Sequence, residues 1–479
     1  MPKQTTGMIP RSCILVWLAA ILALPAAGLS LAGDRPPTVV TVVSLDGQGR
    51  PGRQGLGVVV GQDGRILTSA TLLGPKPRAV IKTASGSLHL LEMVLAEDGL
   101  HALAEIKVEV QGWQAATPAP AGRMRAGEKF FLPVRSGQTQ ALAETRLVKV
   151  LPLSPRLTLL KLEPASLAVD PGAALFNGKG QVAGMAHAFP GGPGTLFLAL
   201  NAEDLRGLKS RQGESEGTEG RAQRSSEEGQ ASFWEGVAAG SRGAYREAQE
   251  KFTAALKAPG PLPEAYYGRG AARYHLGDLN GAVEDLRQAS TRLPGYALAW
   301  LWLGKAREAQ KEQQAAQEAY RQAASADPDL SEAWFHLGEL AYLQGSQAKA
   351  REYLSRVGED FEDACRSWWY LGNLDRSSSR PEEALKAYRR AIELNRGFFP
   401  AYLEGGKVLL LDLGRPQEAI PLLQQGVKLK PDHSLVRYYL ALADILTWNP
   451  RGAWEQYFAL QKIDSGLAET LAKLLDQGE

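Results

Sequence analysis

A sequence pattern that repeats every 34 residues extends over more than half of this 479-residue chain. Glycine recurs every 34 residues, an alanine follows at the same interval up to Ala384 and one residue late at Ala419 and Ala453, and a large apolar or aromatic residue stands four positions after each alanine. A fixed period of this length is typical of a repeat architecture, in which each unit buries its apolar face against its neighbours. The glycines are Gly236, Gly270, Gly304, Gly338, Gly372 and Gly406, and the alanines are Ala248, Ala282, Ala316, Ala350, Ala384, Ala419 and Ala453.

The repeated residue types suit a pair of helices that cross closely. Glycine and alanine leave little side chain at a crossing, and larger residues fill the space beside it. Proline after the second helix, as at Pro294 and Pro328, prevents its continuation. This pattern resembles the tetratricopeptide repeat, with its W-x-x-L-G, A-x-x-x-F and P positions, which are best matched at 300–304 and 334–338.

The resemblance implies an all-α superhelical solenoid. We expect seven repeats over residues 229–467, with units starting near 229, 263, 297, 331, 365, 399 and 434, and a C-terminal capping helix over 468–479. The sixth unit has one extra residue, which we place in the turn 413–416. A weaker last copy is usual because an end unit faces solvent on one side.

The amino terminus reads as an export signal. Residues 1–32 contain Lys3 and Arg11, an apolar run and a small-x-small site at Ser30–Ala32. The alternative is an uncleaved membrane anchor, which would be the only membrane attachment. After cleavage, Cys365 is the only cysteine left, so no intramolecular disulfide can form. Because an exported chain without disulfides fits a bacterial envelope, we expect an exported protein of a bacterial periplasm or cell envelope. Residues 211–228 are rich in Glu, Gly, Ser and Arg, which predicts a disordered linker.

Residues 35–210 alternate short β-branched runs with Gly and Asp turns, which predicts strands. The sequence G-L-G-V-V-V-G-Q-D-G-R-I-L-T at 55–68 resembles the opening of the HtrA (Deg) trypsin-like serine proteases. The resemblance implies an all-β trypsin-like double barrel. Strand candidates are 57–60, 66–68, 79–82, 130–134, 145–151, 157–162, 181–185 and 195–200.

The same resemblance implies that this domain has lost its catalytic triad. Thr71 stands where the family has its catalytic histidine, Ala102 replaces the aspartate, and Pro171 replaces the serine. Threonine is no base near neutral pH, alanine cannot orient an imidazole, and proline offers neither a nucleophilic oxygen nor an N–H for the oxyanion hole. We therefore expect a degenerate triad, with no catalytic residue.

The sequence contains no motif for a metal site or a nucleotide-binding site. The chain has no H-E-x-x-H, no cysteine pair for zinc and no P-loop, so we expect no metal and no cofactor. A net charge of +2 with interspersed acids and bases gives no basic stripe, so we expect no nucleic-acid partner.

The repeat resemblance implies a protein or peptide ligand on the inner surface formed by the first helices. Aromatic residues with scattered cations suit an extended peptide, although any one aromatic could equally pack inside the protein. The regular Lys and Asn pattern of a carboxylate clamp is not evident. The expected exposed inner set is Tyr267, Tyr274, His275, Lys305, Phe335, Tyr342, Trp369, Asn373, Arg376 and Lys407.

The leading interpretation is an exported, non-enzymatic interaction scaffold that joins a degenerate trypsin-like domain to a repeat array. One alternative is an active periplasmic HtrA-like serine protease or chaperone that uses a non-standard site. Another is that the repeats serve self-association rather than a foreign ligand.

Overall fold

A computed structural model describes residues 39–258 and 262–476, with gaps at 47, 49, 74–76, 84–86, 99–102, 111, 118, 120–123, 125–126, 137–138, 155–156, 164–168, 171, 187–195 and 200–218. The expected signal segment 1–32 and linker residues 211–218 lie outside these residues. The chain divides into two compact units, one up to Leu298 and one from Ala299. Among the helices described, none combines the length and the apolar character that a membrane crossing requires.

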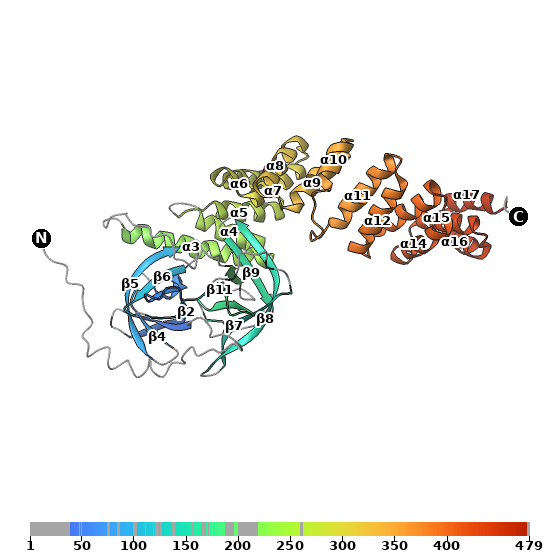
Figure 1. Cartoon of the computed structure of the whole chain (residues 1–479). Helices are drawn as coiled ribbons and strands as arrows, with labels where there is room; N and C mark the ends of the chain where they lie inside the picture. Colours follow the sequence, from blue (N-terminus) through green and yellow to red (C-terminus); the bar gives the residue numbers. More distant parts are fainter. Residues whose placement is uncertain are drawn as a thin grey trace. The chain divides into compact units, whose positions relative to one another are not determined.

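The β region forms two closed antiparallel barrels of six strands each (Figure 1). The first follows the order β1-β2-β3-β6-β5-β4, and the second, read from β7, follows β7-β8-β9-β12-β11-β10, so both have the same topology. The strands are β1 (Val39–Leu45), β2 (Pro51–Val59), β3 (Arg65–Ser69), β4 (Ala79–Lys82), β5 (Leu88–Asp98), β6 (Leu103–Val108), β7 (Lys129–Ser136), β8 (Thr139–Ser154), β9 (Leu157–Glu163), β10 (Ala174–Asn177), β11 (Val182–Ala186) and β12 (Leu196–Ala199).

Both faces of the first barrel's wall are buried along β1 and β3, whereas β5 carries the exposed side chains of Leu90 and Met93. Successive side chains of a strand point to opposite faces, and here Val40 and Ile66 belong to one apolar cluster with Ile106, whereas Val39 and Leu67 belong to another. The second cluster also contains Phe130, Leu132 and Phe176 of the second barrel. β1 therefore reads as a nearly continuous apolar run rather than as a clean alternation.

The eight expected strands each overlap an observed one, and β1, β5, β6 and β10 were not predicted. β1 has the β-branched run VVTVVSL, a signal that was present in the sequence. β5 is harder to recognise because its pairing with β6 shifts register between Leu91 and Met93 and again between Val94 and Ala96. Such bulges break the two-residue alternation on which strand prediction depends.

The C-terminal part is an all-α solenoid of seven helix pairs followed by one further helix (Figure 1). The pairs are α3 (Glu219–Ser241) with α4 (Tyr245–Ala255), α5 (Pro263–His275) with α6 (Leu279–Arg292), α7 (Ala297–Ala309) with α8 (Gln313–Ala326), α9 (Ser331–Leu343) with α10 (Gln347–Leu354), α11 (Ala364–Ser377) with α12 (Pro381–Leu394), α13 (Phe399–Lys407) with α14 (Pro416–Leu429), and α15 (Ser434–Leu446) with α16 (Pro450–Ile463). The last helix is α17 (Ser465–Asp476).

Two boundaries differ from those expected. α3 begins at Glu219, so residues 219–228 of the expected linker are helical. Glu, Arg, Gln and Ala are good helix formers, and a composition poor in apolar residues does not by itself exclude a helix that continues into a repeat. The capping helix begins at Ser465 rather than at residue 468.

The periodic glycines allow the two helices of a pair to approach closely. A Cβ added to Gly304, Gly338 or Gly372 would lie 2.5 Å from a side-chain atom of Tyr320, Leu354 or Tyr388, respectively. Tyr320 and Tyr388 are fully buried and Leu354 is nearly so. In each of these three pairs, a large side chain of the second helix thus lies directly over the glycine of the first helix.

The extra residue of the sixth pair lies in the first helix and not in the turn, which corrects our expectation for 413–416. A π-helical turn, η2 (Val408–Asp412), follows α13. The backbone N–H of Leu413 donates to the carbonyl of Val408 at 3.0 Å, a five-residue spacing. The following turn keeps its ordinary form, because Gly414 has φ of 64° and the equivalent Ser379 of the preceding pair has φ of 57°.

The turn within each pair contains one residue in the left-handed region. Four are glycines, Gly243, Gly277, Gly345 and Gly414, and three are Lys311, Ser379 and Trp448. We expect Ser379→Gly to raise the free energy of unfolding by about 0.5–1 kcal/mol because it removes the steric cost of a Cβ at positive φ. Chemical denaturation followed by circular dichroism measures the change. Ser377→Gly, in the last turn of α11, should instead lower stability, and equal losses in both variants would contradict the prediction.

Candidate functional site

One of the three expected catalytic positions, Thr71, lies near a contact between the two barrels. Thr71 lies in a short 3-10 turn, η1 (Ala70–Leu72), directly after β3, whereas Ala102 and Pro171 lie outside the described residues. Gly172 has φ of +80°, and a Cβ there would lie 2.2 Å from the carbonyl oxygen of Leu56 and 3.1 Å from the amide nitrogen of Ser69. The loop before β10 therefore contacts the end of β3, two residues before Thr71.

Of the histidines in this β region, His89 is the one within the described residues. It lies in β5, where it is paired with Ile81, and its ring meets that of Trp113 edge-on at 5.2 Å. His101 and His187 belong to gaps in the described chain. Of the candidate catalytic positions in the described part of the β region, His89 makes an aromatic contact with Trp113 and Thr71 lies in a turn.

Ion pairs connect successive first helices in the second unit. Lys305 of α7 pairs with Glu332 of α9, and Glu339 of α9 accepts from Arg366 of α11 at 2.7 Å. Arg376 of α11 donates to Glu404 of α13 at 3.0 Å and to Asp412 of η2 at 2.7 Å. We call the surface carrying these pairs the first-helix face; its residues are Lys305, Glu308, Glu332, His336, Glu339, Tyr342, Arg366, Trp369, Asn373, Arg376, Glu404 and Lys407.

The cations that we expected to meet a ligand are already neutralised within the protein. Lys407 donates to both oxygens of Glu404 at 2.9 Å, and Lys305 lies over the ring of Trp302 at 4.7 Å in addition to its ion pair. Asn373 also has a partner, because its Oδ1 accepts the hydroxyl of Tyr388 at 2.7 Å. These polar groups stabilise the stack of repeats before any ligand is bound.

Phe335 was wrongly expected to be exposed. It is 2% exposed and packs in the core with Phe361, whose ring centroid lies 5.7 Å away. The reason is visible in the repeat, because Leu301 and Leu403 occupy the same repeat position and are also buried. Three of the side chains at that position therefore fill the space between pairs, whereas Trp369, which shares the position, is only half-buried.

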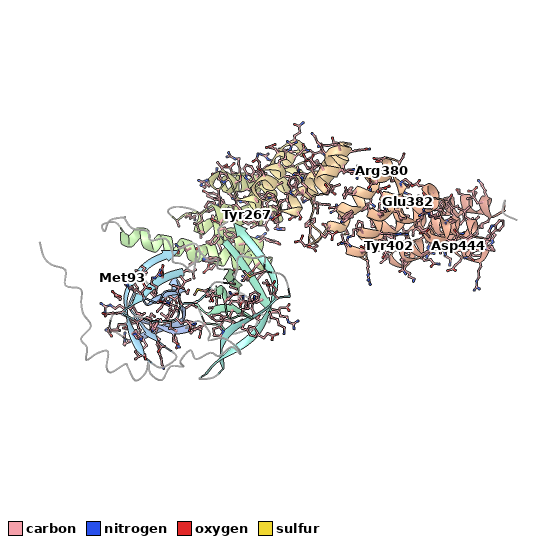
Figure 2. The ribbon with its side chains drawn as sticks, viewed as in Figure 1. Met93, Tyr267, Arg380, Glu382, Tyr402 and Asp444 are labelled. Atoms are coloured by element: carbon pink, nitrogen blue, oxygen red, sulfur yellow. The ribbon has the colours of Figure 1, made fainter. Side chains whose placement is uncertain are left out.

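Eight further residues of the expected set are half-buried, and Tyr267, Tyr342, Trp369, Asn373, Arg376 and Lys407 are among them. Tyr342 and Trp369 both contact Tyr370, with centroids 4.8 Å and 4.9 Å away. In the first unit, His275 is exposed and stacks on Tyr245 at 4.2 Å, and Tyr267 (Figure 2) contacts Tyr296 at 5.0 Å. The remaining half-buried members are Tyr274 and Lys305.

The second helices carry ion pairs of their own. Glu382, at the start of α12, accepts from Arg415 at 2.6 Å, and Arg380 beside it donates to Asp375 at 2.8 Å; Arg380 and Glu382 are labelled in Figure 2. The Glu382–Arg415 pair is exposed, and exposed pairs contribute little individually, typically below about 1 kcal/mol, whereas the side chain of Asp375 is only 11% exposed.

Sequence reasoning missed a cluster formed by Glu308, His336 and Glu339. Each offers one ligand atom, and these three atoms lie within 4.8 Å of one another. The repeat itself held the signal: Glu308 shares its position with Tyr342 and Arg376, and Glu339 shares its position with Lys305 and Lys407. Because residues at equivalent repeat positions lie on the same surface, the positions of the expected binding residues also point to Glu308 and Glu339.

Tyr370 fixes one side of this cluster. Its hydroxyl donates to Oε1 of Glu339 at 2.7 Å. Burial, together with this hydrogen bond, raises the pKa of Tyr370 to about 12, so the hydroxyl remains a donor near neutral pH.

Comparison with known families identifies the helical part. A tetratricopeptide repeat model matches residues 235–297, 276–329, 313–364 and 408–443. The C-terminal region therefore contains tetratricopeptide repeats, as the sequence predicted. No curated protein matches the chain.

Several solved structures are similar to the helical part in fold. YrrB, described as a tetratricopeptide repeat protein with an unusual peptide-binding site, is 21% identical, with a TM-score of 0.36 over 40% of this chain and 100% of its own. PilF of Pseudomonas aeruginosa is 19% identical, with a TM-score of 0.38 over 44% of this chain and 97% of its own. The MamA protein is 21% identical, with a TM-score of 0.32 over 36% of this chain and 92% of its own.

Proposed function

We propose that the chain is an exported, non-enzymatic scaffold of the bacterial cell envelope whose repeats bind a protein or peptide segment. Tetratricopeptide repeats are a protein-interaction scaffold, and the helical region contains them. The observation that carries the proposal is the first-helix face, where aromatic side chains remain half-exposed while the cations are paired. Paired cations are poor anchors for a free carboxylate, so the ligand is held by its apolar side chains and backbone.

Tyr342 and Trp369 are the residues most suited to such a ligand. Both are half-buried and lie against the same ring, that of Tyr370. The indole nitrogen of Trp369 has no hydrogen-bond partner among the described residues, so a small displacement of the ring would let it donate to a peptide carbonyl. Large aromatic side chains of this kind commonly dominate the energy of a protein interface.

Affinity capture from envelope extract tests this proposal. The full chain, immobilised, should retain a partner that is lost from the Tyr342→Ala/Trp369→Ala variant. Tyr353→Ala is the matched control, because Tyr353 is a half-buried aromatic residue on the second helix of the same pair as Tyr342. Equal capture by all three proteins would contradict a role for the first-helix face. Light scattering on the same protein distinguishes self-association from a foreign ligand.

We further propose that the β region is a trypsin-like domain without hydrolytic activity. Two observations support this origin: both barrels have the same strand order, and the loop at Gly172 meets the end of β3 beside Thr71. The loss of activity rests on the sequence, in which Thr71, Ala102 and Pro171 replace the three groups that the mechanism needs.

We expect the purified chain to leave unfolded casein intact and to remain unlabelled by a serine-reactive fluorophosphonate probe, with trypsin as the positive control. The loss of the base, the nucleophile and an oxyanion-hole donor removes far more than the roughly 100-fold to 1000-fold that one donor contributes. Labelling at any serine within residues 35–210 would instead favour the alternative, an active protease with a non-standard site.

A further inference from the structure

The cluster of Glu308, His336 and Glu339 has the composition of a metal site. Two helices supply it: His336 and Glu339 are three residues apart on α9 and so lie on one face of that helix, and Glu308 comes from α7. Imidazole and carboxylate are the usual ligands of zinc and related divalent ions. The three ligand atoms lie within 4.8 Å of one another.

His336 and Glu308 already have a spacing that suits a shared ion. Nδ1 of His336 lies 3.7 Å from Oε2 of Glu308, which is too long for a hydrogen bond. Two ligands of one tetrahedral zinc ion, each about 2.0–2.2 Å from the metal, are about 3.4 Å apart. Nδ1 of His336 is buried and has no hydrogen-bond partner among the described residues. A buried polar atom of this kind calls for an explanation, and a bound cation would provide one.

The surroundings hold the ligands in place. Tyr320 donates its hydroxyl to Oε2 of Glu308 at 2.6 Å, and its ring stacks on that of His336 with centroids 4.8 Å apart. Glu339 is fixed by Arg366 and Tyr370 through Oε1, and a carboxylate has lone pairs for more partners than these two. Partners of this second layer orient metal ligands and strengthen binding.

The local charge also favours a cation. Three carboxylates, Glu308, Glu332 and Glu339, face two cations, Lys305 and Arg366, in the ion pairs and hydrogen bonds of this face, which leaves an excess of one negative charge.

We propose that Glu308, His336 and Glu339 bind one divalent transition-metal ion of the zinc class on the first-helix face, with the remaining coordination positions open to water or to a ligand group. The site joins the third and fourth helix pairs. This inference is independent of the proposed partner binding, because it concerns the free chain.

Calorimetric titration of the untagged, metal-free full chain with Zn²⁺ tests the site, and Co²⁺ absorption reports its coordination. We expect one ion per chain, with an affinity at least about 10-fold weaker in His336→Gln and in Glu308→Gln. Gln at position 308 can still accept the hydroxyl of Tyr320, so this variant should keep its fold. Circular dichroism checks this point.

His433→Gln is the matched control. Nδ1 of His433 is also buried without a hydrogen-bond partner among the described residues, and its ring lies against Phe399 at 4.7 Å, but it belongs to no three-ligand cluster in the described chain. Its variant should bind the ion as the parent does. The absence of binding, or equal affinity in the parent and Glu308→Gln, overturns the proposal, as does a loss confined to His433→Gln.

Discussion

Replacing Tyr388 with alanine is expected to lower the free energy of unfolding by about 3–5 kcal/mol, the usual cost of truncating a large buried ring. Tyr388 is fully buried, and its ring lies over Gly372, where an added Cβ would be 2.5 Å away. Its hydroxyl also donates to Asn373 at 2.7 Å, so truncation leaves both a cavity and an unpaired acceptor. Urea denaturation followed by far-UV circular dichroism measures the change.

The chain supplies its own control for this prediction. Leu286, Leu354 and Leu423 occupy the position of Tyr388 in other pairs and meet the glycines of their own partner helices. Tyr388→Leu should therefore cost much less than Tyr388→Ala. If the two variants were equally destabilised, the hydroxyl bond to Asn373 would be the dominant contribution, and the account of glycine packing would be wrong for this pair.

Replacing Asp285 with alanine is expected to cost about 3 kcal/mol. The Asp285 side chain is only 2% exposed, and it accepts from Arg269 at 2.7 Å and 2.8 Å and from Arg273 at 2.7 Å. Both arginines come from α5, and Asp285 from α6, so one carboxylate joins the two helices of a pair. Its removal leaves two partly buried cations without their shared partner, which is far more costly than the loss of an exposed pair.

Glu284→Ala is the control for that variant. Glu284 is the preceding residue, and it pairs with Arg287 on the surface, where both side chains are 56% exposed. We expect a change below about 0.5 kcal/mol. A loss in Glu284→Ala as large as in Asp285→Ala would show that the effect belongs to this part of α6 and not to the buried ion pair.

The repeats could be predicted because the residues that define each helix crossing lie close together in the sequence. A glycine, an alanine and a large residue at fixed spacing identify the crossing of two helices, and Gly304 with Tyr320 in the structure meets that description. The start of α3 at Glu219 could not be predicted in this way, because the segment has no apolar periodicity from which a helix could be recognised.

The surface was less predictable than the framework. Phe335 was assigned to the wrong face because a single aromatic residue suggests binding, whereas its repeat position, shared with the buried Leu301, indicates packing. The ion pairs between Arg376 and Glu404 and between Arg366 and Glu339 depend on how one pair of helices stacks on the next. That stacking angle is a property of the assembled array, and no interval in the sequence encodes it directly.

The π-helical turn at Val408–Asp412 confines a change of chain length to a single place. Each added residue would turn the rest of an α-helix by about 100°, which would aim every later side chain in a new direction. Here the offset is absorbed before Leu413, and Pro416 opens α14 just as Pro381 opens α12. The added residue therefore leaves the phase of all subsequent helices intact, so the array can vary in length at one point without altering the surface that its other members present.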